Sequence, residues 1–248
     1  MTAIVQDRVQ GRYVPADDPS TSGEQRVLRW GGLAGILGGL LFIVVFLIVG
    51  VFIGPDPVEP AGAVMRFPDI RTGRTVENGL YLVVLVLWVT HHLALYRALR
   101  GTSLAPALFG SAIGLLGLAM LAVGALPHAV NLPLSNLYHA PGATPEDQAM
   151  LAMVWQGTQG ILNGQLVTGL VVVPFGLVAL GMAMLRTPSF GKAYGRAGVA
   201  LGIVGAGAAV ALLVDPMSFI AVIGVFALIV FHLVVGWKVY RLSRAEAV

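Results

Sequence analysis

Long uninterrupted runs of apolar residues dominate the pattern of hydrophobic and polar positions along this chain. Each run is near the roughly 20 residues that a helix needs to cross about 30 Å of hydrocarbon. The runs cover residues 31–53, 78–96, 105–126, 160–185, 197–214 and 217–239. The pattern therefore predicts an all-α polytopic membrane protein, built as a bundle of six transmembrane helices.

A further helical segment precedes the fourth run. Thr144-Pro145-Glu146-Asp147 is typical of a helix start, with Thr as N-cap, Pro at the first position and carboxylates in the first turn. Helical pattern then continues almost to Leu185, about 60 Å at 1.5 Å per residue and twice the hydrocarbon thickness. Residues 145–157 are therefore expected to lie in the outer interface or to project from it, with a bend near Gly157 or Gly160.

The polar ends of the chain are assigned to tails. Residues 1–29 form a flexible N-terminal tail, residues 30–242 the six-helix domain and residues 243–248 a C-terminal tail. The first apolar run is longer than the core of a signal peptide, and the tail before it is longer than a signal peptide's basic start. The first span is therefore predicted to be retained.

Composition agrees with a membrane protein. Of 248 residues, 57% are hydrophobic and 11% are charged, with a mean hydropathy of +0.85, whereas charged residues make up about a quarter of soluble domains. The chain contains no cysteine, which excludes disulfides, thiol catalysis and cysteine-bound metal sites.

Basic residues are distributed unequally between the two sides of the predicted bundle. One side holds Arg8, Arg12, Arg26, Arg29, Arg97, Arg100, Arg186, Lys192, Arg196, Lys238, Arg241 and Arg244, and the other holds Arg66, Arg71 and Arg74. The positive-inside rule then predicts that both termini are cytoplasmic. The excess of arginine over lysine, with the Ala, Gly and Val bias, is typical of a bacterial coding sequence, so the predicted location is the bacterial cytoplasmic (inner) membrane.

Small residues recur at intervals of four in four of the runs. They are Gly31, Gly35 and Gly39; Gly110 and Gly114; Gly160, Gly164 and Thr168; and Gly198, Gly202 and Ala206. Such stripes let helix backbones approach closely in lipid. The first interpretation is packing within the bundle, and the alternative is a seam for a homo-oligomer or another membrane partner.

Polar amides occupy one face of the fourth helix. Gln156, Gln159 and Asn163 follow a spacing of three and four, and amides in a membrane need partners. We expect them to face the bundle and to fix helix register through hydrogen bonds. The alternative is a ligand pocket open to the outside, completed by His128, Asn131 and Asp215.

Three arginines lie in the predicted outer loop after the first span. Arg66, Arg71 and Arg74 can pair with Asp69 and Glu77 or with lipid phosphate, which is the first interpretation. The alternative is an anion-binding lid, because guanidinium groups donate two hydrogen bonds at once to phosphate or carboxylate.

Histidines are the only strong metal ligands inside the predicted spans. His91 and His92 in the second span and His232 in the sixth lie at similar depth, in the half nearer the cytoplasm. Histidines on facing helices at matched height are the minimum for haem or metal binding. The first interpretation is structural: the histidines are not expected to converge on one cofactor, and hydroxyls or carbonyls are expected as their partners, with Thr90 as one candidate. No cofactor is predicted, and histidine-ligated haem is the alternative.

The chain lacks the sequence signatures of common enzymes. It has no phosphate-binding loop, GxSxG elbow, HExxH motif or paired intramembrane acids, so catalysis is not expected. Its basic residues are explained by topology and by attraction to anionic lipid. The predicted partners are therefore membrane lipids and not nucleic acid.

The layout resembles a known group of proteins. A basic entry into a Gly-rich first span (residues 29–35), a second span that ends in a basic turn (residues 95–100), a long outer segment and a final hairpin resemble bacterial six-span integral membrane proteins grouped as a domain of unknown function. The resemblance covers residues 28–242. It implies a six-helix bundle in the inner membrane and carries over no functional residues.

Three classes of function follow. The first is a non-enzymatic interaction, assembly or envelope-maintenance protein, favoured by the glycine stripes. The second is a small-molecule or lipid binder or transporter that uses the outer polar pocket. The third is a haem or metal protein that uses the histidines.

Overall fold

The computed structural model describes residues 19–55, 57, 59–125, 127–214 and 220–245, which contain helices and no strand. In chain order the elements are α1 (Pro19–Ile48), the π-helical turn η1 (Val49–Ile53), α2 (Pro60–Leu99), α3 (Leu104–Val123), α4 (Pro127–Tyr138), α5 (Pro145–Arg186), α6 (Lys192–Val214) and α7 (Ile220–Ala245). The predicted all-α class is confirmed.

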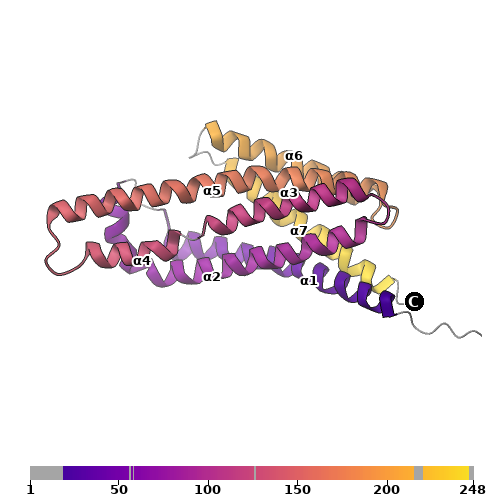
Figure 1. Cartoon of the computed structure of the whole chain (residues 1–248), viewed down its shortest axis with the longest axis horizontal. Helices are drawn as coiled ribbons and strands as arrows, with labels where there is room; N and C mark the ends of the chain where they lie inside the picture. The colour runs from indigo at the N-terminus through magenta and orange to yellow at the C-terminus, as the bar shows by residue number, and fades with distance from the viewer. Residues whose placement is uncertain (1–18, 56, 58, 126, 215–219, 246–248) are drawn as a thin grey trace, which may run out of the picture.

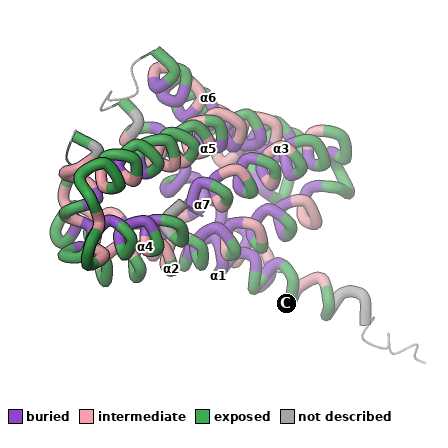
Figure 2. Tube along the Cα trace, turned by 60° about the vertical axis from the view of Figure 1, so that its left-hand side comes forward, coloured by how far each residue is buried: buried purple, intermediate pink, exposed green. Residues whose placement is uncertain are grey.

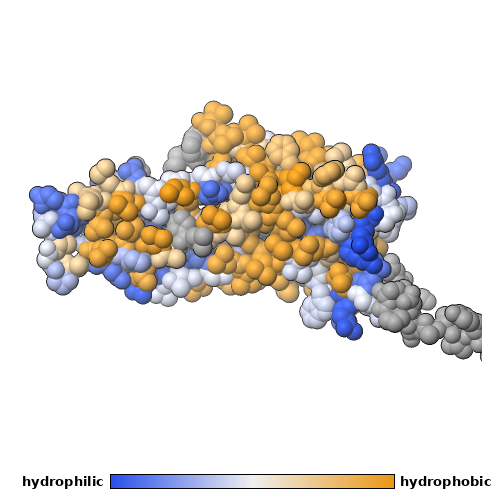
Figure 3. All heavy atoms as spheres, in the orientation of Figure 1, coloured by the Kyte–Doolittle hydropathy of each residue, from blue (hydrophilic) through white to orange (hydrophobic). Residues whose placement is uncertain are grey.

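Six of these helices are long and apolar enough to cross a membrane: α1, α2, α3, α5, α6 and α7. They lie side by side in one elongated bundle (Figure 1). Large apolar side chains such as Leu47, Phe109, Ile203 and Trp237 are exposed on its outside, and apolar residues cover the middle of the visible surface (Figure 3). An apolar belt of this kind requires lipid around it, so the chain is a multi-pass membrane protein.

Both described ends of the chain lie at the same end of the bundle (Figure 1). We call this the basic end. It contains the start of α1, the α2–α3 and α5–α6 connections and the end of α7. An ion pair between Arg97 and Glu24, 2.8 Å long, joins α2 to α1 here.

Glycines set the distance between neighbouring helices. A Cβ atom built at Gly110 of α3 would lie 2.8 Å from the backbone nitrogen of Leu180 in α5, and one at Gly202 of α6 would lie 2.8 Å from that of Val178. A Cβ atom at Gly31 of α1 would overlap the Ala94 Cβ atom of α2, and one at Gly39 would lie 2.7 Å from the Leu233 side chain of α7. For these positions the interpretation of the stripes as packing within the bundle is confirmed. Gly160 and Gly164 differ, because nothing lies within 4 Å of a Cβ atom at either position.

Buried residues form inward-facing rows along the helices (Figure 2). The largest buried cluster runs through the membrane bundle and includes Trp88, Leu118, Leu177 and Phe231. A second cluster lies at the end opposite the basic end, where α2, α4 and α5 meet. We call this part the head, made of residues 60–75, 127–138 and 145–157.

The head replaces the loops that were expected there. Helix α2 begins at Pro60 and not near residue 78, and its first turns bury Val64 and Phe67 against Tyr138 and Trp155. The ring centroids of Phe67 and Trp155 are 5.2 Å apart in an edge-on arrangement. The prediction of a loop was wrong because the charged residues of this segment made it resemble a loop. Its apolar stripe is buried only by residues of α4 and α5, which are distant in the sequence.

The start of α5 was predicted correctly. The Thr144 hydroxyl accepts a hydrogen bond from the Asp147 N–H, 3.2 Å long, and the Asp147 carboxylate accepts one from the Thr144 N–H, 3.1 Å long. Residues 145–157 belong to the projecting head, as expected. The helix continues without a break through Gly157 and Gly160, where a bend was expected.

The boundaries of the two tails also change. Helix α1 begins at Pro19, so residues 19–29 are helical and not a flexible tail. Proline is favoured in the first turn of a helix, where its missing N–H has no partner to lose. Helix α7 extends into the predicted C-terminal tail as far as Ala245. Residues 1–18 and 246–248 lie outside the described residues.

Candidate functional site

Three histidines meet in the centre of the bundle. His91 and His92 come from α2 and His232 from α7, and all three side chains are completely buried. The ring centroid of His232 lies 5.5 Å from that of His91 and 5.4 Å from that of His92, and the centroids of His91 and His92 are 6.4 Å apart. The sequence predicted their matched depth, and the fold brings them into one histidine cluster.

The cluster lies near mid-depth in the bundle. A Cβ atom built at Gly114 would lie 2.6 Å from the His92 ring atoms Nε2 and Cδ2. Gly114 is halfway along α3, which runs from Leu104 to Val123. On α2, however, His91 and His92 lie eight and seven residues before the helix ends at Leu99, so the expected position in the half nearer the basic end stays a prediction.

Each imidazole donates a hydrogen bond to a backbone carbonyl through Nδ1. His91 bonds to Gly31 of α1 at 2.9 Å, His92 to Trp88 at 3.0 Å and His232 to Leu228 at 2.8 Å. A carbonyl oxygen only accepts, so we assign the ring proton to Nδ1 in all three residues. Thr90 does not take part, because its hydroxyl donates to the Val86 carbonyl.

The other nitrogen of each ring has no hydrogen-bond partner among the described residues. The Nε2 atoms of His91, His92 and His232 are all fully buried. With the proton on Nδ1, each presents a lone pair to an apolar core. An unsatisfied buried polar atom costs about 1–3 kcal/mol, and such atoms are few in native proteins. Three in one cluster is therefore an unusual concentration of electron-pair donors.

Aromatic and glycine contacts fix the rings. The Trp88 indole stacks on the His232 imidazole, with centroids 4.0 Å apart. Cβ atoms built at Gly35 and Gly38 of α1 would lie 2.7 Å from the His91 Nδ1 atom and the Trp88 indole nitrogen. These glycines therefore make room for the rings as well as for the helices. Sequence reasoning missed Trp88, although its spacing of three and four residues from the two histidines places all three on neighbouring positions of α2.

The spacing of the rings is close to that of imidazoles around one metal ion. A metal–Nε2 bond of about 2 Å puts the ring centre roughly 3 Å from the ion, so ligands in tetrahedral or trigonal arrangement have ring centres roughly 5 to 5.5 Å apart. Two of the three separations match. As they stand, however, no group of three or more His, Asp or Glu in the described part of the chain is placed to hold a metal ion. Coordination would thus require the rings to turn.

The outer polar pocket is not assembled from its expected residues. Gln156 and Asn163 are exposed and Gln159 is half-buried, so the expectation that the stripe faces the bundle is wrong. A Cβ atom at Gly124, just after α3 ends, would lie 3.5 Å from the Leu166 nitrogen. The three amides therefore lie at or beyond the level where α3 ends.

The remaining residues of that pocket are dispersed or undescribed. Asn131 is buried in α4, within the head. The side chain of His128 and the whole of Asp215 lie outside the described residues.

The three arginines do not converge on an anion site. Arg66 donates to the backbone carbonyls of Ile53 and Pro55, at the end of η1. Arg74 pairs with Glu77 at 3.5 Å, as expected from the sequence. Arg71 is exposed. Arg66 thus caps the carbonyl end of the first span, a role that the sequence does not indicate because backbone carbonyls leave no sequence pattern.

Comparison of the chain with protein-family models, curated proteins and solved structures gave no match. The resemblance drawn from the layout therefore stays a prediction.

Proposed function

We propose that this protein binds one transition-metal ion at the centre of its bundle, through the Nε2 atoms of His91, His92 and His232. The observation that carries the proposal is the combination of three buried Nε2 lone pairs without partners and three Nδ1 atoms held by backbone carbonyls. Metal-binding histidines almost always donate their second ring N–H to a carbonyl or carboxylate, which fixes the ring nitrogen that faces the metal.

The chemistry of the cluster favours an ion over haem. Imidazole suits zinc, copper, iron and nickel. Haem would need a flat space between facing histidines, whereas the rings here pack against Gly35, Gly114 and Trp88. A single ion needs less space than haem, but the imidazoles must turn and their Nδ1 hydrogen bonds must shift for the three Nε2 atoms to converge.

Charge favours monovalent copper among these metals. The buried residues of the described chain include no Asp or Glu, so three neutral ligands would leave the full charge of the ion in an apolar core. The cost of burying a charge rises steeply, roughly with the square of that charge, so a divalent ion is penalised about four times as much as a monovalent one.

The distribution of charge supports the orientation that accompanies this proposal. The basic end of the bundle carries the larger group of basic residues. Among those that the structure describes are Arg26, Arg100 and Arg186, near the ends of their helices. We assign this end to the cytoplasm by the positive-inside rule, and the membrane to the bacterial inner membrane from composition. The assembly function expected from the glycine stripes remains an untested prediction.

The experiment is a metal titration of the full chain in detergent, with copper(I) and zinc(II) compared under anaerobic conditions. We expect one copper ion per chain, and a loss of affinity of at least about tenfold for His91→Leu, His92→Leu and His232→Leu. His139→Leu is the matched control, because His139 also donates Nδ1 to a carbonyl, at 2.8 Å, but is exposed just after α4 ends, far from the cluster. Absence of stoichiometric binding, or equal binding by all four variants, would overturn the proposal.

A further inference from the structure

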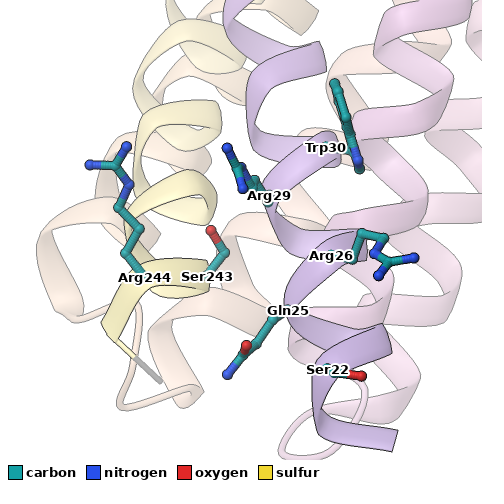
Figure 4. Close-up of a pocket in the computed structure, with 7 residues that line it drawn as sticks. All are labelled: Ser22, Gln25, Arg26, Arg29, Trp30, Ser243 and Arg244. Carbon is teal, nitrogen blue, oxygen red and sulfur yellow. The ribbon is translucent and has the colours of Figure 1, made fainter. Parts of the chain in front are cut away.

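A cavity lies at the basic end, away from the histidine cluster. It has a volume of about 470 Å³ and lies along the seam between α1 and α7 (Figure 4). Its lining consists of Ser22, Gln25, Arg26, Arg29 and Trp30 from α1 and Ser243 and Arg244 from α7. The lining combines polar and cationic side chains and contains no carboxylate among the described residues.

Arg29 on α1 and Arg244 on α7 flank the seam, Arg26 lines the far side, and the described lining contains no acidic residue. The nearby carboxylate of Glu24 is held by Arg97, with an ion pair of 2.8 Å. Arg244 is held in place by Tyr240, because its guanidinium donates to the Tyr240 hydroxyl and lies 4.7 Å from the centre of that ring. Guanidinium groups bind phosphate oxygens in pairs through their planar fork of N–H donors. The cavity is thus suited to a phosphate group.

An apolar groove adjoins the cationic cavity. It measures about 360 Å³ and is lined by Gly23, Arg26, Val27, Trp30, Thr90, Leu93 and Ala94. Arg26 and Trp30 line both spaces, and Figure 4 shows them on the side of α1 away from Arg244. The Trp30 side chain is 64% exposed, and exposed tryptophan is typical of the level where hydrocarbon meets the polar headgroups.

We propose that this double site binds one anionic phospholipid, with its phosphate between Arg29 and Arg244 and part of an acyl chain in the apolar groove. The groove favours a lipid over free phosphate. An acyl chain gains binding energy by covering an apolar surface, whereas a soluble phosphate ion does not. The position at the end of the apolar belt places the phosphate at headgroup level. Basic pockets between transmembrane helices bind anionic lipid headgroups in this way. The site does not depend on the metal proposal.

The test is native mass spectrometry of the full chain in delipidated detergent, titrated separately with phosphatidylglycerol and phosphatidylcholine. We expect phosphatidylglycerol to bind at least about tenfold more tightly. The double variant Arg29→Gln/Arg244→Gln should lose this preference. Arg186→Gln should keep it, since Arg186 is exposed at the same end but lines neither space.

Two further measurements distinguish a bound lipid from a bound soluble phosphate. Glycerol phosphate at the same concentration should not displace the lipid, and displacement would assign the cavity to a soluble phosphate ligand and overturn the lipid proposal. Trp30→Ala should weaken binding of phosphatidylglycerol with long acyl chains more than binding of its dihexanoyl form. Equal binding of the two lipids by the unmodified chain, or wild-type selectivity in the double variant, would also overturn it. Size-exclusion profiles show whether each variant is folded.

Discussion

The Trp88 indole lies nearly parallel to the His232 imidazole, with the two planes inclined by 9°. The pair joins α2 to α7 at the histidine cluster, and no other tryptophan of the described chain stacks on a cluster histidine. Trp88 is therefore the residue best placed to report on events at the three imidazoles.

Copper binding should quench the fluorescence of Trp88. We expect Trp88→Phe to remove most of the metal-dependent change in emission while leaving one copper ion bound per chain, because phenylalanine can keep the stacking contact. Trp155→Phe is the control, since Trp155 packs in the head against Phe67. Quenching of undiminished size in Trp88→Phe would place the metal elsewhere.

A stability measurement separates a metal ligand from a structural histidine. In metal-free protein, His92→Leu should change the free energy of unfolding by less than about 1 kcal/mol, because the lost Nδ1 hydrogen bond is offset by removal of the unsatisfied Nε2 atom. With copper present, the wild type should gain thermal stability and the variant should not. Thermal unfolding in detergent, with chelator and with copper, measures both effects. A loss of several kcal/mol in chelator would support the structural role instead.

Helix contacts through glycine can be tested with a matched pair. Gly110→Ala should destabilise the protein by about 1–3 kcal/mol, because its Cβ atom would press on the backbone of α5. Gly207→Ala should be neutral or stabilising by up to about 1 kcal/mol, since nothing lies within 4 Å of its Cβ position and alanine is the better helix former. Equal thermal stability of the two variants would contradict the described α3–α5 contact.

Because Arg66 caps the carbonyl end of the first span, its replacement should destabilise the η1 segment locally. Arg66→Met removes the hydrogen bonds to the carbonyls of Ile53 and Pro55, at a cost of about 1–3 kcal/mol. Hydrogen exchange should then speed up in the η1 segment. Arg71→Met, at an exposed position of the same helix, should leave exchange there unchanged.

The orientation of the chain in the membrane is measured with one reporter at the last residue and one in a loop. A reporter at Val248 and one inserted after Gly142, between α4 and α5, should label opposite faces of the membrane, with Val248 in the cytoplasm. Labelling of both on the same face would contradict the topology.

Some of this architecture follows from the sequence alone because lipid constrains composition directly. Each span has to be apolar over its whole circumference, so the six runs were visible without knowledge of their neighbours. The start of α5 was also local, since Thr144, Pro145 and Asp147 lie within one turn. The head was missed because Phe67 has to meet Trp155, far away in the chain, before its stripe has a partner.

The histidine cluster was partly predictable for the same reason. Matched depth in two spans follows from counting residues, and it brought His92 and His232 to the same level. Carbonyl partners were expected, but the three carbonyls that accept could not be predicted, since every residue carries one. The amides of Gln156 and Asn163 were misassigned because the sequence does not show that α3 ends level with Leu166 and leaves this part of α5 without α3 beside it.

Helix α2 has a further consequence, because it belongs to the head and to the histidine cluster at once. Phe67 and His91 are parts of the same helix, about 36 Å apart at about 1.5 Å per residue. A rod of this length that tilts by about 5° moves one end by about 3 Å relative to the other. Metal–ligand distances tolerate only about 0.2 Å. A tilt of α2 driven from the outer head would therefore change the distances between the two α2 imidazoles and that of His232 by more than a metal site tolerates.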